Sequence, residues 1–448
     1  MPYVSQAEAD WAAAEKVWED MEAELDAKPP GGEAHGKAPG GVNGAAEPAQ
    51  GTTGAAPARG RASTAAHPTL SYTDLLENPA AAVAMLDRSG YMLVTDVCTS
   101  AEAAYHLDAI AREHDSALRM EHRAAGAAAV PGAKGCSLLK RHGFAYMKSV
   151  QDCRTTIGKD RVAKVFAALL STGGTSVSAE ELVMSCDAIA WAVNGVTASR
   201  MGVAKELREN KHTKWLAEKQ HGSTLRMHTD IVPGSKGFLY QQELRKAGFL
   251  PSSLQSCLNL METTVSSPTF VCAEMSSNEL SELQKRIGTG QGSKDLYSLT
   301  PSDVAEFKIC ERFRYVDVPA GALTLWKSEL PHSNSRGDPR VYKNLPPGEP
   351  SRCGVMMCFG PRVLQTEEEL LKKLEMAEKG WSHDHWPCHA SGNGNNFRGL
   401  GSNHNKFKDS AAVALTDTQR RLLGCRKRDA EHQPLDARSN KRRSELDS

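Results

Sequence analysis

The first 27 residues alternate hydrophobic and polar positions in steps of three and four, within an otherwise acidic stretch. The hydrophobic positions are Val4, Ala7, Trp11, Ala14, Trp18, Met21 and Leu25. This spacing is typical of one face of an amphipathic helix. We therefore predict an acidic helix over residues 1–27. It either packs on its own domain or binds a protein partner through its two tryptophans.

The next segment, residues 28–68, loses this pattern and is rich in Ala, Gly and Pro. Such a composition buries too little hydrophobic surface to offset the entropy lost on folding. We predict a disordered linker here, with the globular part of the chain beginning near Leu70.

Helical periodicity in the globular part is clearest in three places. Residues 101–114 follow Thr99 and Ser100, either of which can cap a helix, and Glu102 lies near its start. Residues 160–170 form a second amphipathic segment, and residues 366–378 form a charged one. Residues 276–311 are polar and predicted to be partly helical, with a helix beginning near Pro301.

Short hydrophobic segments separated by turn residues predict strands along much of the remaining chain. They are residues 87–98, 182–193 (a pair of strands or one long strand), 223–230, 255–260, 269–272, 313–318, 321–326 and 352–359. Many short strands of this kind are typical of a sandwich or barrel. The predicted fold class is mainly β with flanking helices.

One of these strands carries the sequence His228-Thr229-Asp230, and His332 follows about a hundred residues later. Residues i and i+2 of a strand point to the same face, so His228 and Asp230 can present an imidazole and a carboxylate together. With His332 from a neighbouring strand, they would form a facial triad of two histidines and one carboxylate. Such a triad leaves positions open on Fe(II), as oxygenases require. These three residues are the predicted metal ligands and the predicted catalytic set.

Composition does not change this interpretation, but it narrows the cellular compartment and the classes of binding partner. The 54 basic residues balance the 54 acidic ones, so no net charge favours nucleic acid or a membrane surface. The eleven cysteines include no CxxC pair, which is typical of free thiols in a reducing compartment. The sequence shows neither a signal peptide nor a hydrophobic run of roughly 18 residues. We expect a cytoplasmic or nuclear protein without a membrane partner.

Residues 70–362 resemble the phytanoyl-CoA dioxygenase-like family of Fe(II)/2-oxoglutarate-dependent oxygenases. The similar stretches are residues 90–94 with the helix that follows them, 184–191, 255–260 with 268–271, and 318–326 leading to His332. The resemblance implies a double-stranded β-helix (jelly-roll or cupin-like) core. It also implies Fe(II) as cofactor and 2-oxoglutarate as cosubstrate, with hydroxylation of an organic substrate by O₂ and release of succinate and CO₂. An aspartate at position 230, rather than a small residue that would admit a halide, points to hydroxylation.

The family also implies an arginine that binds the far carboxylate of 2-oxoglutarate. A guanidinium group suits this role because it can form two parallel hydrogen bonds with a carboxylate. Arg352 matches the position best, at the start of a strand, and Arg340 is the alternative. A hydroxyl from Ser333 or Thr324 could assist. The residues that bind the substrate itself are not identified.

Residues on either side of this domain leave other functions open. Residues 363–410 are predicted to be a helical, Gly- and Asn-rich extension, and residues 411–448 a basic, disordered tail. The tail and the basic residues near His332 in sequence (Arg336, Arg340, Lys343 and Arg352) would suit a nuclear oxygenase that acts on a nucleic-acid base. A catalytically silent β-helix that acts as a binding module is the third hypothesis.

Two further groups of polar residues have less specific interpretations. His383, His385, Cys388 and His389 could bind zinc, but four donors within seven residues are a poor match to a closed tetrahedral site. Asp187 is interpreted as a hydrogen-bonded residue of a strand rather than as a catalytic group.

Overall fold

The computed structural model describes residues 66–124, 148–185, 187, 189–193, 227–265, 267–288, 296–334, 350–378, 385–388 and 415–425. The predicted N-terminal helix and the linker before residue 66 lie outside the described residues.

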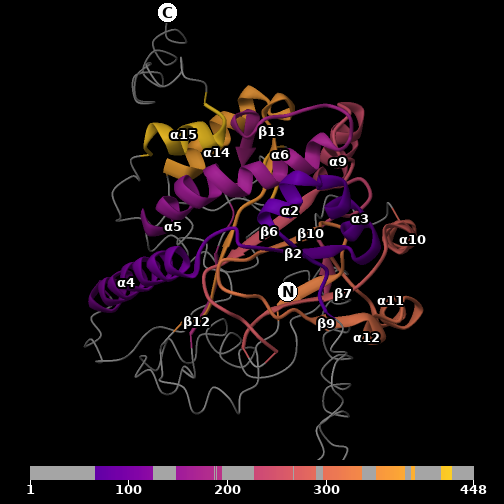
Figure 1. Cartoon of the computed structure of the whole chain (residues 1–448), viewed down its shortest axis with the longest axis horizontal. Helices are drawn as coiled ribbons and strands as arrows, with labels where there is room; N and C mark the ends of the chain where they lie inside the picture. Colours follow the sequence, from indigo (N-terminus) through magenta and orange to yellow (C-terminus); the bar gives the residue numbers. More distant parts are fainter. Residues whose placement is uncertain are drawn as a thin grey trace, which may run out of the picture. The chain divides into compact units, whose positions relative to one another are not determined.

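A six-stranded sheet crosses the described domain (Figure 1). All of its neighbouring strands are antiparallel except the first two, which are parallel. In spatial order its strands are β1 (Thr69–Ser71), β2 (Tyr91–Thr95), β10 (Leu323–Lys327), β6 (Leu254–Asn259), β12 (Pro350–Met356) and β4 (Ile189–Val193).

A second sheet of five short strands is antiparallel throughout. Its order is β8 (Tyr297–Ser298), β5 (His228–Thr229), β11 (His332–Asn334), β7 (Phe270–Ala273) and β9 (Phe313–Tyr315). A separate pair joins β3 (Leu182–Met184) to β13 (Phe359–Pro361).

The alternation of side chains along the large sheet divides the hydrophobic core into two. On β10, Leu323 and Leu325 belong to one buried cluster, whereas Trp326 belongs to the other. The first cluster lies between the sheet and helices, and the second includes the side chains of β7. The large sheet is therefore sandwiched between a helical layer and the small sheet.

The helical layer includes α2 (Tyr72–Glu77), α3 (Pro79–Ser89), α5 (Lys148–Cys153), the π-helix η2 (Arg154–Val162), α6 (Ala163–Ser171) and α9 (Lys236–Lys246). Helices α10 (Ser277–Ile287), α11 (Pro301–Glu306) and α12 (Ile309–Arg312) lie near the small sheet (Figure 1). Three further helices of the described residues are α4 (Ser100–Ala124), α14 (Glu367–Glu378) and α15 (Asp417–Leu423).

Helices contain more of the described residues than strands do, so the fold is a mixed helical and antiparallel-sheet fold rather than mainly β. Part of the difference comes from residues 87–89, which were predicted to start a strand but continue α3. Gly90 ends that helix with φ of 75°, a left-handed conformation that glycine adopts without strain, and β2 begins only at Tyr91.

Other elements match the predictions in part. The described residues within 182–193 form two strands, β3 and β4, which lie in different sheets. Those within 276–311 are partly helical, and Pro301 occupies the first turn of α11. Thr99 caps α4: the Glu102 backbone N–H donates to the Thr99 hydroxyl at 3.2 Å, and the Glu102 carboxylate accepts from the Thr99 backbone N–H at 2.8 Å.

The C-terminal region differs from its prediction at one point. Residues 411–448 were predicted to be a disordered tail, but α15 lies within them, and Leu422 is buried in the first core cluster. The prediction was wrong for the residues of α15. It was based on the basic composition of the tail and did not consider Leu422 and Leu423, which are buried against the domain. The predicted tail also carries two clusters of basic residues, Arg426–Arg428 and Lys441–Arg443, which lie outside the described residues.

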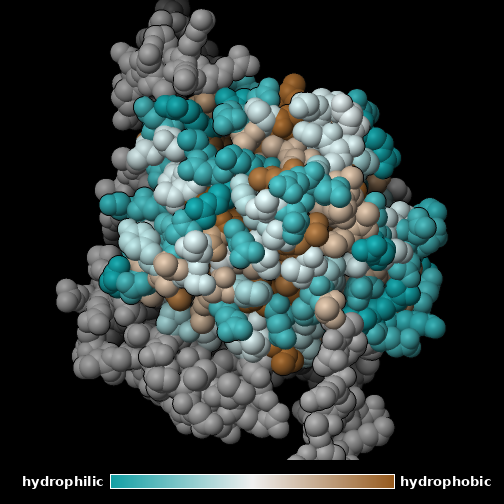
Figure 2. All heavy atoms as spheres, in the orientation of Figure 1, coloured by the Kyte–Doolittle hydropathy of each residue, from teal (hydrophilic) through white to brown (hydrophobic). Residues whose placement is uncertain are grey.

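Exposed hydrophobic side chains do not gather into one patch on the face shown in Figure 2, where they are scattered among hydrophilic ones. None of the helices in the described part of the chain has both the length and the hydrophobicity needed to cross a lipid bilayer.

Candidate metal centre

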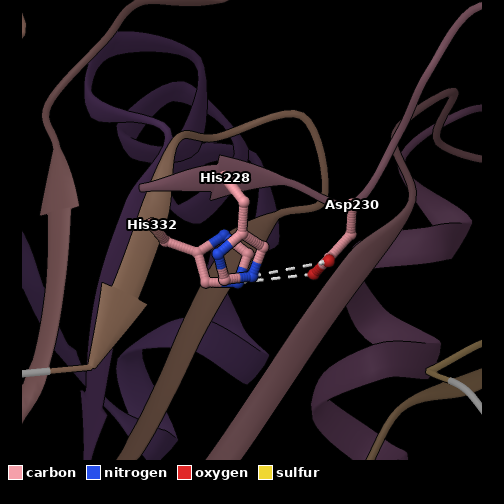
Figure 3. Close-up of side chains that lie close together, drawn as sticks. All are labelled: His228, Asp230 and His332. Carbon is pink, nitrogen blue, oxygen red and sulfur yellow. Dashed lines mark ion pairs between the residues drawn. The ribbon is translucent and has the colours of Figure 1, made fainter. Parts of the chain in front are cut away.

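Two neighbouring strands of the small sheet bring His228 and His332 together. In the antiparallel pair of β5 and β11, His332 lies directly opposite His228. Residues that face each other in this way project from the same side of the sheet. Their ring centroids are 4.5 Å apart. Asp230 follows β5 immediately and completes the group (Figure 3).

The three side chains converge on one small volume. The Nε2 atom of His228 lies 3.7 Å from Oδ1 of Asp230, and the Nε2 atom of His332 lies 3.3 Å from Oδ2 (Figure 3). One ligand atom from each residue lies within 4.8 Å of the others. The prediction that these three residues form a group is therefore confirmed.

Hydrogen bonds hold Asp230 in place. Its backbone N–H donates to the Ser328 carbonyl at 3.0 Å. The side-chain amide of Gln255, on β6, donates to Oδ2 at 2.9 Å. Since β6 belongs to the large sheet, this bond ties the site to the opposite layer of the sandwich. Sequence reasoning missed Gln255, which carries no motif of its own.

The ring of His332 is held with Nε2 directed at Asp230. Its Nδ1 lies 2.9 Å from the Leu330 carbonyl, which can only accept, so Nδ1 is the donor of this hydrogen bond and Nε2 is the ring atom directed at Asp230. Phe270 stacks on the ring at 5.7 Å, and Trp326 lies 5.4 Å away. Trp326 is 2% exposed and belongs to the second core cluster.

The surroundings of Asp230 favour its ionised form. Burial by itself opposes ionisation, but the imidazoles of His385, His332 and His228 hold the pKa of this carboxyl well below its usual range. A negatively charged carboxylate beside two imidazoles is the donor set that a divalent cation needs.

His385 is a component of the site that the sequence interpretation did not include. It comes from residues 385–388, and its Nε2 lies 3.9 Å from Oδ2 of Asp230. Its Nδ1 contacts the carboxylate of Asp187, which lies between β3 and β4. Asp187 is thus hydrogen-bonded, as predicted, but it lies between two strands rather than within one. No spacing in the sequence indicates that residues 187, 230 and 385 meet.

The alternative zinc cluster is not assembled by the described residues. Cys388 is fully buried, and its thiol donates to the Pro361 carbonyl at 3.3 Å. His383 and His389 lie outside the described residues.

Arg352 lies on β12 with only 2% of its surface exposed. It donates from Nη1 to the side-chain oxygen of Asn334 at 2.6 Å. Asn334 is two residues beyond His332 on β11 and therefore shares its face of the small sheet. The guanidinium group thus contacts the layer that carries the triad. The alternative, Arg340, and the nearby Arg336 and Lys343 lie outside the described residues.

The two candidate hydroxyls differ in their placement. Thr324 alternates with Leu323 and Leu325, which face the helices, so it shares the triad-facing side of β10 with Trp326. Its hydroxyl accepts from Asn259 at 3.1 Å. Ser333 pairs with Val271 and lies on the opposite face of the small sheet from His332. Because this register directs Ser333 away from the triad, Ser333 is not placed to assist in binding 2-oxoglutarate.

The donor set fits Fe(II). Two imidazoles and one carboxylate on one side of a metal ion match the facial triad of non-heme iron oxygenases and leave the other side for exogenous ligands. Zinc in a structural site would require a fourth protein ligand at the same distance. Among the described side chains, the group within mutual ligand distance contains only these three.

Comparisons with known proteins give distant structural likenesses. No model of a known protein family matches the sequence, and no curated protein matches it. A hypothetical protein JW0805 from Escherichia coli is 13% identical, with a TM-score of 0.45 over 80% of this chain and 86% of that one.

Two further solved structures are similar at the same level. EctD from S. alaskensis with bound Fe is 14% identical, with a TM-score of 0.36 over 64% of this chain and 78% of that one. GlcNAc Inducible Gene 2 (DUF1479) from Candida albicans is 11% identical, with a TM-score of 0.41 over 84% of this chain and 88% of that one. These likenesses are too distant to assign a family, so the function is inferred from the site.

Proposed function

We propose that this protein is an Fe(II)- and 2-oxoglutarate-dependent dioxygenase that hydroxylates an organic substrate and releases succinate and CO₂. The observation that carries the proposal is the convergence of His228, Asp230 and His332 within 4.8 Å of one another. A silent binding module has no need of these three side chains in this arrangement.

The surroundings of the triad support a metal-binding role beyond the three residues themselves. His332 is oriented by the Leu330 carbonyl, and Asp230 by the Gln255 amide. Metal-binding histidines and carboxylates are commonly held by such outer hydrogen bonds, which set the tautomer and direct the lone pair. A structural histidine pair has no comparable requirement.

Arg352 is the proposed anchor for the far carboxylate of 2-oxoglutarate. It is a buried guanidinium on the triad-facing side of the large sheet, and its neighbour Asn334 belongs to the same strand as His332. A buried cation of this kind attracts a carboxylate strongly because little water competes for it. Thr324 lies on the same side of the sheet and is the proposed assisting hydroxyl.

When bound, iron would supply the centre at which 2-oxoglutarate is oxidatively decarboxylated by O₂ and the substrate is hydroxylated. His228, Asp230 and His332 would hold the ion on one side only. Phe270 and Trp326 pack around His332 and exclude water from its rear. Arg352 would orient the cosubstrate by its far end, so that the keto acid end faces the triad.

We further propose that the sandwich is a double-stranded β-helix of the phytanoyl-CoA dioxygenase-like type. Two sheets, antiparallel except for the β1–β2 pair, enclose the second core cluster, and His332 of the triad lies beside Phe270 and Trp326 of that cluster. This arrangement gives the two histidines a rigid support on neighbouring strands.

The test is an anaerobic titration of the full chain with Fe(II) and then 2-oxoglutarate, followed by visible absorption. Wild type should develop a charge-transfer band, and succinate should form once air is admitted. His228→Ala should show neither. The control is His106→Ala, which removes a buried histidine of α4 that lies beside Thr156.

Absence of both the band and succinate in wild type would refute the proposal. Metal binding by wild type without any effect of 2-oxoglutarate would retain the metal centre and reject the cosubstrate.

A further inference from the structure

A third histidine lies beside the carboxylate of the triad, on a segment more than fifty residues beyond His332. The Nε2 atom of His385 is 3.9 Å from Oδ2 of Asp230, and its Nδ1 contacts the Asp187 carboxylate. The side chain of His385 is 12% exposed and that of Asp187 is 2% exposed. Each nitrogen of this largely buried ring therefore faces a carboxylate oxygen.

The residues that follow His385 fix its position. Trp386 is buried in the first core cluster and packs so closely on Gly237 that a β-carbon at that glycine would lie 2.4 Å from the indole. The ammonium group of Lys373 donates to the Pro387 carbonyl at 2.8 Å. The segment is thus anchored to two different helices, and its placement beside the triad is part of the fold.

The geometry distinguishes His385 from the three predicted ligands. His228, Asp230 and His332 form the group of described side chains whose ligand atoms lie within 4.8 Å of one another, and His385 is outside it. Its nearest neighbour in the group is Oδ2 of Asp230, the same oxygen that accepts from Gln255. His385 is therefore placed to act on the carboxylate rather than on the metal.

We propose that His385, oriented by Asp187, is a positioning residue of the metal centre that holds the Asp230 carboxylate in its metal-binding orientation. This inference rests on the proposed function, because it presumes that the triad binds a metal. Carboxylates that bind a metal are themselves commonly held by outer polar side chains, and removal of such a partner commonly weakens metal binding by about 10- to 100-fold.

The experiment measures Co(II) binding to the full chain, with Co(II) as a spectroscopic substitute for Fe(II). The dissociation constant is expected to rise about 10- to 100-fold in His385→Ala and in Asp187→Asn. The double variant, with both His385→Ala and Asp187→Asn, should have a dissociation constant no higher than that of the more weakly binding single variant. The reason is that both substitutions remove the same interaction. His106→Ala should bind like wild type.

Two further readouts separate positioning from a general loss of structure. The visible spectrum per bound Co(II) should be the same in wild type and His385→Ala, because the coordinating atoms do not change. His385→Gln should recover most of the affinity, since its amide nitrogen can occupy the place of Nε2, whereas the shorter His385→Asn should not. Thermal melting of each variant checks folding. If Asp187→Asn does not fold, the three His385 variants decide the question.

Equal Co(II) affinity in wild type and His385→Ala would overturn the inference and leave the proposed function standing. A changed Co(II) spectrum in His385→Ala would also overturn it, because His385 would then be a metal ligand. Failure of wild type to bind Co(II) would refute both the inference and the proposed function.

Discussion

Neighbouring polar groups orient three of the functional side chains of the site, His332, Asp230 and Arg352. The Leu330 carbonyl selects the tautomer of His332, and the Gln255 amide holds Asp230. Asn334 accepts a hydrogen bond from Arg352 and links it to the triad strand. At the scale of single residues, the site is therefore defined by side chains together with the groups that orient them.

The role proposed for Arg352 depends on its two-pronged geometry as well as its charge. Arg352→Lys keeps the charge but loses the planar fork, so 2-oxoglutarate should bind less tightly by about 1.5–3 kcal/mol, or about 10- to 150-fold. Affinity for Fe(II) should not change. The measurement is a 2-oxoglutarate titration of the Fe(II)-loaded protein.

The matched control for this variant is Arg314→Lys, on β9, where the arginine pairs with Glu274 at 2.9 Å. It should leave 2-oxoglutarate binding unaltered. Wild-type affinity in Arg352→Lys would reject Arg352 as the anchor and direct attention to Arg340.

At the scale of elements, the short strands of the small sheet are positioned by pairing with neighbouring strands. Strand β5 has only two residues, too few to be stable alone, and it is positioned by β11 on one side and β8 on the other. The register of β11 then decides which side chains face the metal. A shift by one residue would turn His332 away and bring Ser333 to the site.

Helix α4 is joined to the π-helix η2 by an ion pair between Glu102 and Arg161, with atoms 2.7 Å apart. Hydrogen bonds from Arg161, and then from Thr99, lower the pKa of Glu102 to about 2. Because the folded-state pKa is depressed, this contribution to stability is complete above the ordinary pKa of 4.5 and is lost as the pH falls toward about 2.

Glu102→Gln retains a capping side chain but removes the charge. It should lower the free energy of unfolding at pH 7 by less than about 1 kcal/mol, because the pair is exposed by more than a third and is screened by solvent. Urea unfolding of both proteins between pH 7 and pH 3 measures the difference, which should shrink as the pH falls. If the difference in unfolding free energy between the two proteins grew toward pH 3, the lowered pKa of Glu102 would be contradicted.

At the scale of the whole described domain, the chain returns to its own core after the last strand. Trp386 and Leu422 both belong to the cluster that lies between the large sheet and the helices. Residues beyond 362 therefore complete the core of the domain and place His385 at the metal centre.

Trp386→Ala should couple a loss of stability to a loss of metal binding. Removing a fully packed indole costs about 3–5 kcal/mol in the free energy of unfolding. The same change releases the segment that carries His385, so Co(II) affinity should fall as in His385→Ala. Urea unfolding and Co(II) titration at 20 °C or below provide the two measurements.

Val363→Ala is the control, because that side chain is 76% exposed and its loss should change stability by no more than about 0.5 kcal/mol. Normal Co(II) binding by a folded Trp386→Ala protein would show that the segment does not depend on this anchor.

The sequence by itself determined the local features of this protein. Short hydrophobic segments between turn residues indicated most of the strands, and Thr99 with Glu102 indicated the start of α4. His228 and Asp230 were recognisable because a strand places residues i and i+2 on one face. These features depend on neighbouring residues only, so a linear pattern is sufficient to reveal them.

Tertiary structure alone decided which distant residues complete the site. Gln255 and His385 reach Asp230, and Asp187 reaches His385, from three separate parts of the chain, and no local spacing relates them. The face to which Ser333 points was likewise settled only by the register of β11 against β7. Contacts of this kind depend on how sheets pair and pack, because the free energy that places each side chain is contributed by the whole core rather than by its neighbours in sequence.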